Sequence, residues 1–149
     1  MNEIFTTVYS KIETLVYENP RDLNLQVCQI LKQEIYHYDW VGFYILKDRA
    51  LQLGPYVGKP TDHTQIAIGK GVCGQVAVKK KTIIVQDVNL EDNYIACSID
   101  VQSEIVVPVI KNGEFIAELD IDSHSPAPFT NDDQFFLEKV CGLLADTFQ

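Results

Sequence analysis

The sequence predicts an α+β fold, an antiparallel β-sheet with helices packed on one face and ligand-binding loops on the other. Three observations carry this prediction: two amphipathic helical patterns open the chain, strand-like segments with tight turns fill its middle, and one helical pattern closes it. Runs of strands flanked by helices are typical of α+β proteins, and an antiparallel sheet needs helices on only one face.

Composition places the chain among ordinary globular proteins. It has 149 residues, of which 46% are hydrophobic, so we expect a single domain over residues 1–149. The formal net charge is -9 and the basic residues are scattered apart from the run Lys79, Lys80 and Lys81, which excludes nucleic acid as an expected partner. No stretch resembles a secretory signal or approaches the roughly 18 apolar residues of a membrane helix. We therefore expect a cytoplasmic protein without a membrane partner.

Helical patterns occupy both ends of the chain. Apolar residues recur at helical spacing over residues 3–19, where Pro20 ends the pattern, and again from residue 23 to His37 or Tyr38. A last helix begins near Asn131, which we expect to cap it. These segments supply the predicted helical layer.

Short strands fill the middle of the chain. Segments rich in β-branched and aromatic residues predict six strands, over residues 40–46, 50–56, 63–68, 82–86, 105–110 and 114–121. A short helix is expected at 74–79, between the third and fourth strands. The polar segment 87–102 has no clear period, and a loop of that length in a compact domain is often functional.

The last hairpin decides where three acids lie. If Asn112 and Gly113 form a two-residue turn, Glu104 falls opposite Ile121, on the other face from Asp120. If Lys111 joins them in a three-residue turn, Glu104 falls directly opposite Asp120. Asp122 shares the face of Asp120 in either register, because strand side chains alternate.

Acidic residues at strand ends are often solvent-exposed surface charges. This alternative stays open for Glu104, Asp120 and Asp122. If the three converge, however, one of them should have a raised pKa and keep its proton near neutrality. Such a group can protonate a leaving oxygen, while its ionised neighbours bind an ammonium.

Two cysteines are candidates for chemistry. Cys28 and Cys141 lie beside apolar helical stripes and are expected to be core residues. Cys73 precedes the predicted short helix, whose N-terminal amides would favour a thiolate, and Cys97 ends the long loop. Their separation along the chain fixes no distance, so a disulfide between them is an assumption.

Other chemistries find no support in the sequence. The chain has no CxxC or HxxxH pair, and its three histidines are widely spread, so no metal site is expected. It also has no GxSxG, phosphate loop or dinucleotide fingerprint, and no cofactor is expected.

Six blocks, in order along almost the whole chain, resemble the free methionine-(R)-sulfoxide reductases, which are single GAF-domain enzymes. The blocks are WVGFY (40–44), LGPYVGKP (53–60), GKGVCG (69–74), IAC (95–97), SEIVVP (103–108) and LDIDS (119–123). The resemblance implies a GAF-like sheet and thiol-dependent reduction of free L-methionine-(R)-sulfoxide.

The resemblance also implies roles for particular residues. Cys97 matches the catalytic cysteine, which would become a sulfenic acid, and Cys73 matches the cysteine that resolves it as an intramolecular disulfide. A thioredoxin-type partner would reduce that disulfide. The matching substrate-binding residues are Glu104, Asp120 and Asp122 around the sulfoxide oxygen and the amine, and Trp40 and Tyr44 at the methyl end. A homodimer is an assembly to test.

The chain departs from the family pattern at four positions. His63 stands where many members have a third cysteine, Ser98 where many have aspartate, and Asn89 and Tyr94 where many have histidines. The missing cysteine favours a two-thiol cycle, and the loop changes bear on the tuning of Cys97. The competing prediction is a GAF sensor that binds a small amine or amino acid without turnover.

Overall fold

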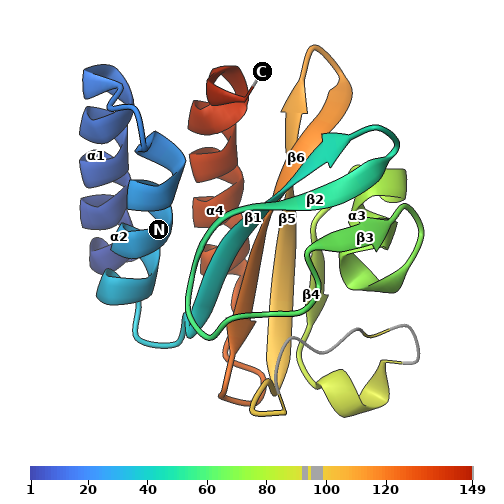
Figure 1. Cartoon of the computed structure of the whole chain (residues 1–149). Helices are drawn as coiled ribbons and strands as arrows, with labels where there is room; N and C mark the ends of the chain where they lie inside the picture. The colour runs from blue at the N-terminus through green and yellow to red at the C-terminus, as the bar shows by residue number, and fades with distance from the viewer. Residues whose placement is uncertain (92–93, 95–98, 149) are drawn as a thin grey trace.

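The computed structural model describes residues 1–91, 94 and 99–148, and Figure 1 shows three helices on one side of a single sheet. The helices of that layer are α1 (Glu3–Glu18), α2 (Leu23–Glu34) and α4 (Asn131–Leu144). The sheet has the order β3-β2-β1-β6-β5-β4, and all neighbouring strands are antiparallel. The predicted α+β architecture is confirmed.

The remaining elements complete the sheet and its second face. The strands are β1 (Trp40–Lys47), β2 (Ala50–Val57), β3 (Gln65–Ala67), β4 (Ile83–Val85), β5 (Ser103–Lys111) and β6 (Glu114–Ser123). Helix α3 (Gly71–Lys79) lies against β5 and β6 on the side away from the other three helices (Figure 1). Short 3₁₀ turns follow at Val88–Leu90 and Ala145–Thr147. None of the described helices has the length and apolarity needed to cross a membrane.

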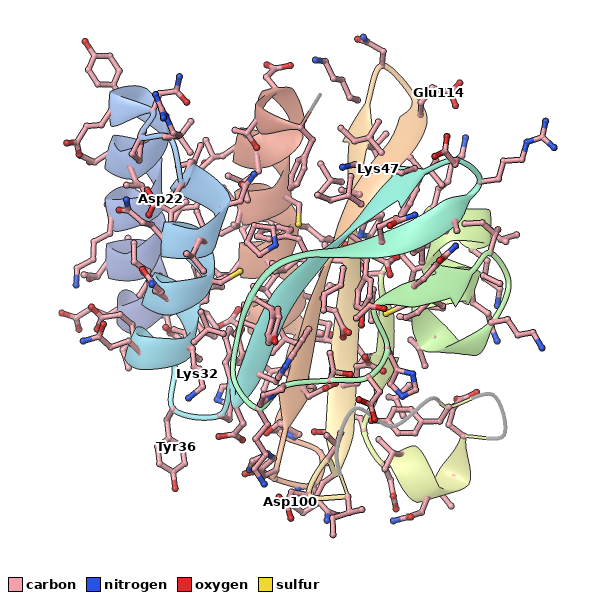
Figure 2. The ribbon with its side chains drawn as sticks, viewed as in Figure 1. Asp22, Lys32, Tyr36, Lys47, Asp100 and Glu114 are labelled. Atoms are coloured by element: carbon pink, nitrogen blue, oxygen red, sulfur yellow. The ribbon has the colours of Figure 1, made fainter. Side chains whose placement is uncertain are left out.

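Two-residue turns fix both long hairpins. Asp48 and Arg49 join β1 to β2 with φ values of 50° and 67°, and Asn112 and Gly113 join β5 to β6 with φ values of 53° and 80°. Positive φ at both central residues gives a turn whose twist matches that of the strands. Figure 2 shows Lys47 and Glu114 near these turns at one end of the sheet, and Asp100 at the other end.

Several predicted boundaries were wrong. Helix α2 ends at Glu34 because His37 and Tyr38 turn away to bond Asp133, with His37 Nε2 at 2.8 Å and the Tyr38 hydroxyl at 2.7 Å from Oδ1. Helix α4 is capped by Thr130 instead of Asn131, since Thr130 and Asp133 form a reciprocal capping box. Strand β3 is also shorter than predicted.

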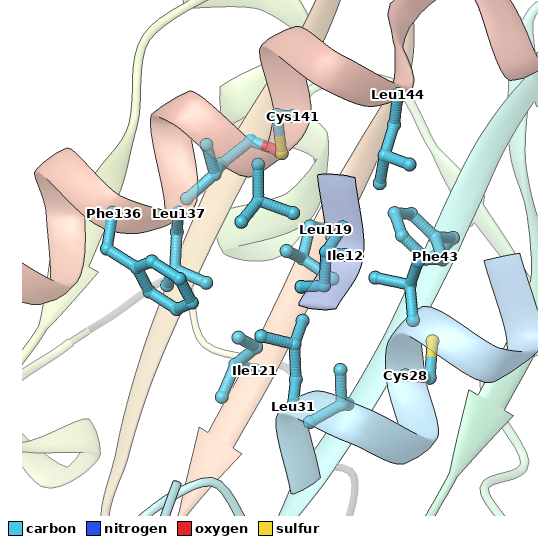
Figure 3. Packing of buried hydrophobic residues seen from close by; sticks show 14 of the residues in the cluster. Ile12, Cys28, Leu31, Phe43, Leu119, Ile121, Phe136, Leu137, Cys141 and Leu144 are labelled. Atoms are coloured by element: carbon cyan, nitrogen blue, oxygen red, sulfur yellow. The ribbon is translucent and has the colours of Figure 1, made fainter. Parts of the chain in front are cut away.

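The sheet separates two apolar layers. Its helical side holds the larger core, where α2 packs on β1 and β2, α4 packs on β5, and α1 packs against these two helices (Figure 3). Labelled members of this core are Ile12, Cys28, Leu31, Phe43, Leu119, Ile121, Phe136, Leu137, Cys141 and Leu144. Cys28 and Cys141 are thus core residues, as predicted. A smaller cluster on the opposite side includes Trp40, Tyr44, Val76 and Val106.

Candidate active site

A row of carboxyl groups lies on the sheet face opposite the larger core. Glu118, Asp120 and Asp122 alternate along β6, and Glu104 lies directly opposite Asp122 on β5. Their exposed fractions are 0%, 1%, 0% and 3%. The predicted convergence of Glu104, Asp120 and Asp122 is therefore present, and Glu118 extends the row to four acids.

A β-bulge brings Glu104 into this row. The hairpin pairs Ile110 with Phe115 but Val109 with Ala117, so Ile116 is an extra residue on β6. A bulge shifts the pairing beyond it by one residue. Both predicted registers were wrong: the turn has two residues, as in the first alternative, yet Glu104 joins the acids and pairs with Asp122.

Cys73 lies among these carboxyl groups. It belongs to the first turn of α3, is 5% exposed, and places Sγ 3.5 Å from Asp120 Oδ2. Gly74 lets the helix approach β3 closely, since a Cβ there would lie 2.7 Å from the Ala67 carbonyl oxygen. The approach of α3 thus delivers a thiol to the acid row.

The prediction that the start of α3 favours a thiolate at Cys73 was wrong for this structure. Burial raises the pKa of the Cys73 thiol well above its ordinary value, and the negative charges of Asp120, Glu118 and Glu104 raise it further. These effects outweigh the amides at the start of α3. Cys73 is therefore a thiol in the described structure.

Two of the acids are set up to hold protons. Burial raises the pKa of Glu118 well above its ordinary value, Asp120 adds to the effect, and the nearby Cys73 thiol opposes it. Burial likewise raises the pKa of Asp120, although hydrogen bonding to Glu104 and Cys73 opposes the rise. The expected raised pKa is thus found at Asp120, one of the three predicted acids, and also at Glu118, which was not among them.

A small cavity opens beside Cys73. Its lining includes Tyr44, His63, Lys70, Cys73, Glu104 and Asp120. The free space is about 10 Å³, enough for about one water molecule, so an amino-acid ligand requires its walls to move outward. Tyr44 donates a hydrogen bond from its hydroxyl to the His63 carbonyl oxygen at 2.8 Å, which ties β1 to one wall.

Trp40 forms the end of the acid row. It lies opposite Asp122 across the β1–β6 pair, and Tyr44 lies opposite Glu118. The indole stacks on Tyr56 with ring centroids 5.4 Å apart and donates from Nε1 to the Lys59 carbonyl oxygen at 3.0 Å. The structure therefore brings both predicted aromatic residues to the same face as the acids.

The remaining predicted positions are described only in part. Cys97 and Ser98 lie outside the described residues. Asn89 belongs to the 3₁₀ turn after β4, and Tyr94 packs against the smaller apolar cluster. His63, at the position of the missing cysteine, lines the cavity. Glu118 was missed, although its spacing of two residues from Asp120 was a visible signal.

The fold and the internal pocket define a GAF-domain protein. The GAF domain model matches residues 19–148. The free methionine-R-sulfoxide reductase of Escherichia coli is 33% identical over 94% of this chain and 75% of its own length. The yeast protein of the same name is 43% identical over 71% of this chain and 61% of its own length.

Solved structures give the same result. The free methionine-R-sulfoxide reductase of Neisseria meningitidis, solved with its substrate, has a TM-score of 0.91 and 33% identity, covering 99% of this chain and 91% of that chain. The reduced Staphylococcus aureus structure has a TM-score of 0.90 and 31% identity, covering 97% and 95%. The chain belongs to the free methionine-R-sulfoxide reductase family of GAF-domain proteins, which confirms the predicted family.

Proposed function

We propose that this protein reduces free L-methionine-(R)-sulfoxide to methionine through a two-thiol cycle. The observation that carries the proposal is the buried thiol of Cys73 among carboxyl groups, on a face closed at one end by Trp40. Family membership supplies the substrate. We take Cys97 as the attacking thiol because it lies in the IAC block that resembles the family.

The first half-reaction needs a nucleophile and a proton. The Cys97 thiolate attacks the sulfoxide sulfur, and one proton is added to the sulfoxide oxygen. The oxygen passes to the Cys97 sulfur as its bond to the methionine sulfur breaks, so methionine leaves and Cys97 becomes a sulfenic acid. We assign the proton for the departing oxygen to Asp120, because burial raises the pKa of its carboxyl group. Glu104 and Asp122 bind the substrate ammonium, and Trp40 and Tyr44 enclose its methyl end.

The second half-reaction restores the thiols. Cys73 attacks the sulfenic sulfur, a disulfide forms, and water leaves with the Cys73 proton. A thioredoxin-type dithiol then transfers two electrons and two protons by thiol–disulfide exchange. This cycle fits a reducing, cytoplasmic setting and a single domain over residues 1–149, and a homodimer would be compatible with it.

A reductase assay with both free sulfoxide epimers and thioredoxin tests the proposal. We expect turnover of the R epimer only, no turnover by Cys97→Ser, and a single turnover without recycling by Cys73→Ser. Absence of R-epimer turnover, or turnover unaffected by Cys97→Ser, contradicts the proposal. Binding of the sulfoxide without thiol oxidation would identify a sensor instead.

A further inference from the structure

We propose that Cys73, Glu104 and Asp120 form a binding site for a zinc ion. The Cys73 sulfur and one carboxylate oxygen from each acid lie within 4.8 Å of one another, and all three side chains are buried. Zinc accepts one thiolate together with carboxylate oxygens. The site was not expected from the sequence, because its three ligands come from α3, β5 and β6.

The spacing of the ligand atoms matches zinc geometry. With zinc–sulfur and zinc–oxygen distances of about 2.3 and 2.0 Å, two ligands at the tetrahedral angle lie about 3.5 Å apart. Cys73 Sγ and Asp120 Oδ2 are 3.5 Å apart. A metal between these two atoms therefore needs no movement of either. The Glu104 oxygen lies within 4.8 Å of both atoms.

A buried oxygen within the cluster gives a second indication of a cation. Among the described residues, Asp120 Oδ1 is buried and has no hydrogen-bond partner. Glu118 is fully buried two residues away on the same strand face, and its partner is the Cys73 thiol, one of the proposed ligands. Buried polar groups are normally paired, and a cation on Asp120 would give Glu118 a partner charge.

The positive charge of Lys70 in the same cavity disfavours the binding of a cation. Lys70 lines the cavity together with His63. The ligands must therefore bind as anions, with the thiol and the acids releasing their protons to solvent. Three negative ligands, with Glu118 behind them, outweigh one ammonium.

Zinc at this site would hold the Cys73 sulfur as a thiolate and fill the cavity. If the proposed reductase cycle is correct, bound zinc inhibits it by withholding the resolving thiol. Binding itself does not depend on that cycle, so a protein that binds zinc but lacks reductase activity would contradict the proposed function and leave this inference standing.

Titration of the reduced protein with zinc, against a competing chelating dye, tests the site. We expect one zinc per chain in the wild type and binding weaker by at least about 100-fold in Cys73→Ser and Asp120→Asn, because removing a ligand costs no less than removing its supporting groups. Glu118→Gln should weaken binding by about tenfold. Glu114→Gln, at the exposed start of the same strand, is the matched control and should bind as the wild type does.

Two further measurements cover variants that fail to fold. In the wild type, zinc should slow alkylation of Cys73, read by peptide mass spectrometry, and cobalt should give a thiolate-to-metal charge-transfer absorption. A wild type that binds no zinc, or equal affinity in Cys73→Ser, would overturn the site.

Discussion

Glu118 is an acid that the fold removes fully from water. Its side chain is fully buried between Tyr44 on β1 and Pro108 on β5. An ionised carboxylate in that position would lose its hydration without a compensating cation among the described residues. Burial therefore favours the protonated form of Glu118, and its environment ties folding to pH.

The sign of this coupling follows from the two pKa values. Burial raises the pKa of Glu118 in the folded state above the ordinary 4.5. Between these values the folded protein holds a proton that the unfolded chain has lost, so the free energy of unfolding falls as pH rises. Glu118→Gln has no proton to lose. We therefore expect the variant to gain stability relative to the wild type as pH rises.

Urea unfolding at about pH 4.5, 6 and 8 measures this difference. The free energy of unfolding of Glu118→Gln minus that of the wild type should increase at each step. Glu114→Gln, whose side chain is exposed on the same strand, serves as the control. A difference for Glu118→Gln that stays constant with pH would show that the carboxyl group is ionised in the folded protein.

At the scale of single elements, the sequence allowed most of the fold to be predicted because its signals are local. Pro20 separates two helices, and Asn112 with Gly113 marks a two-residue turn. The bulge at Ile116 is different, since it depends on packing on both faces: Phe115 joins the smaller cluster, while Ala117 joins the larger core. No local signal marks that change, so the register of Glu104 was missed.

The candidate active site shows the same contrast between local sequence signals, which allowed prediction, and contacts between elements, which did not. The alternation of Asp120 and Asp122 predicts a shared face, and the structure contains it. The state of Cys73 was predicted wrongly because its pKa depends on burial and on acids from two other elements, which dominate over its own helix. Contacts between elements, unlike strand alternation, leave no pattern in a single sequence.

Strand β1 holds its tryptophan in place with glycine. A Cβ at Gly42 would lie 2.5 Å from the Trp40 ring and 2.7 Å from Tyr56 Cβ. Gly42→Ala must therefore displace the indole from the end of the acid row. We expect a raised KM for the sulfoxide with a smaller change in kcat, because the chemistry occurs at the thiols.

Fluorescence can report this displacement directly, because Trp40 is the only tryptophan of the chain. The emission of Gly42→Ala should shift relative to the wild type. Gly142→Ala is the matched control: a Cβ added there would meet no described atom within 4 Å, so its emission and KM should stay unchanged, with a gain of up to about 1 kcal/mol from helix propensity. Unchanged emission and KM in Gly42→Ala would exclude Trp40 from the substrate wall.

At the scale of the whole molecule, the sheet divides stability from chemistry. One face is covered by α1, α2 and α4 and is almost entirely apolar, whereas the other holds Cys73 and the buried acids. Burying acids lowers stability, and such acids are retained where they serve function. Substitutions on the two faces should therefore have opposite effects.

Leu137→Ala and Asp120→Asn compare the two faces. Leu137 is fully buried on α4, in the larger core on the other side of the sheet from the acid row. Its truncation should lower the free energy of unfolding by about 2–5 kcal/mol, while kcat/KM of the folded protein stays unchanged. Asp120→Asn keeps the shape but removes the proton donor, so kcat should fall while stability is maintained or raised. Denaturant unfolding and steady-state kinetics on the same preparations measure both quantities. A lower kcat in fully folded Leu137→Ala would show that activity depends on the packing of the helical layer. Marked unfolding of Asp120→Asn would show that the acid face contributes to stability. Either result would show that the two faces are coupled.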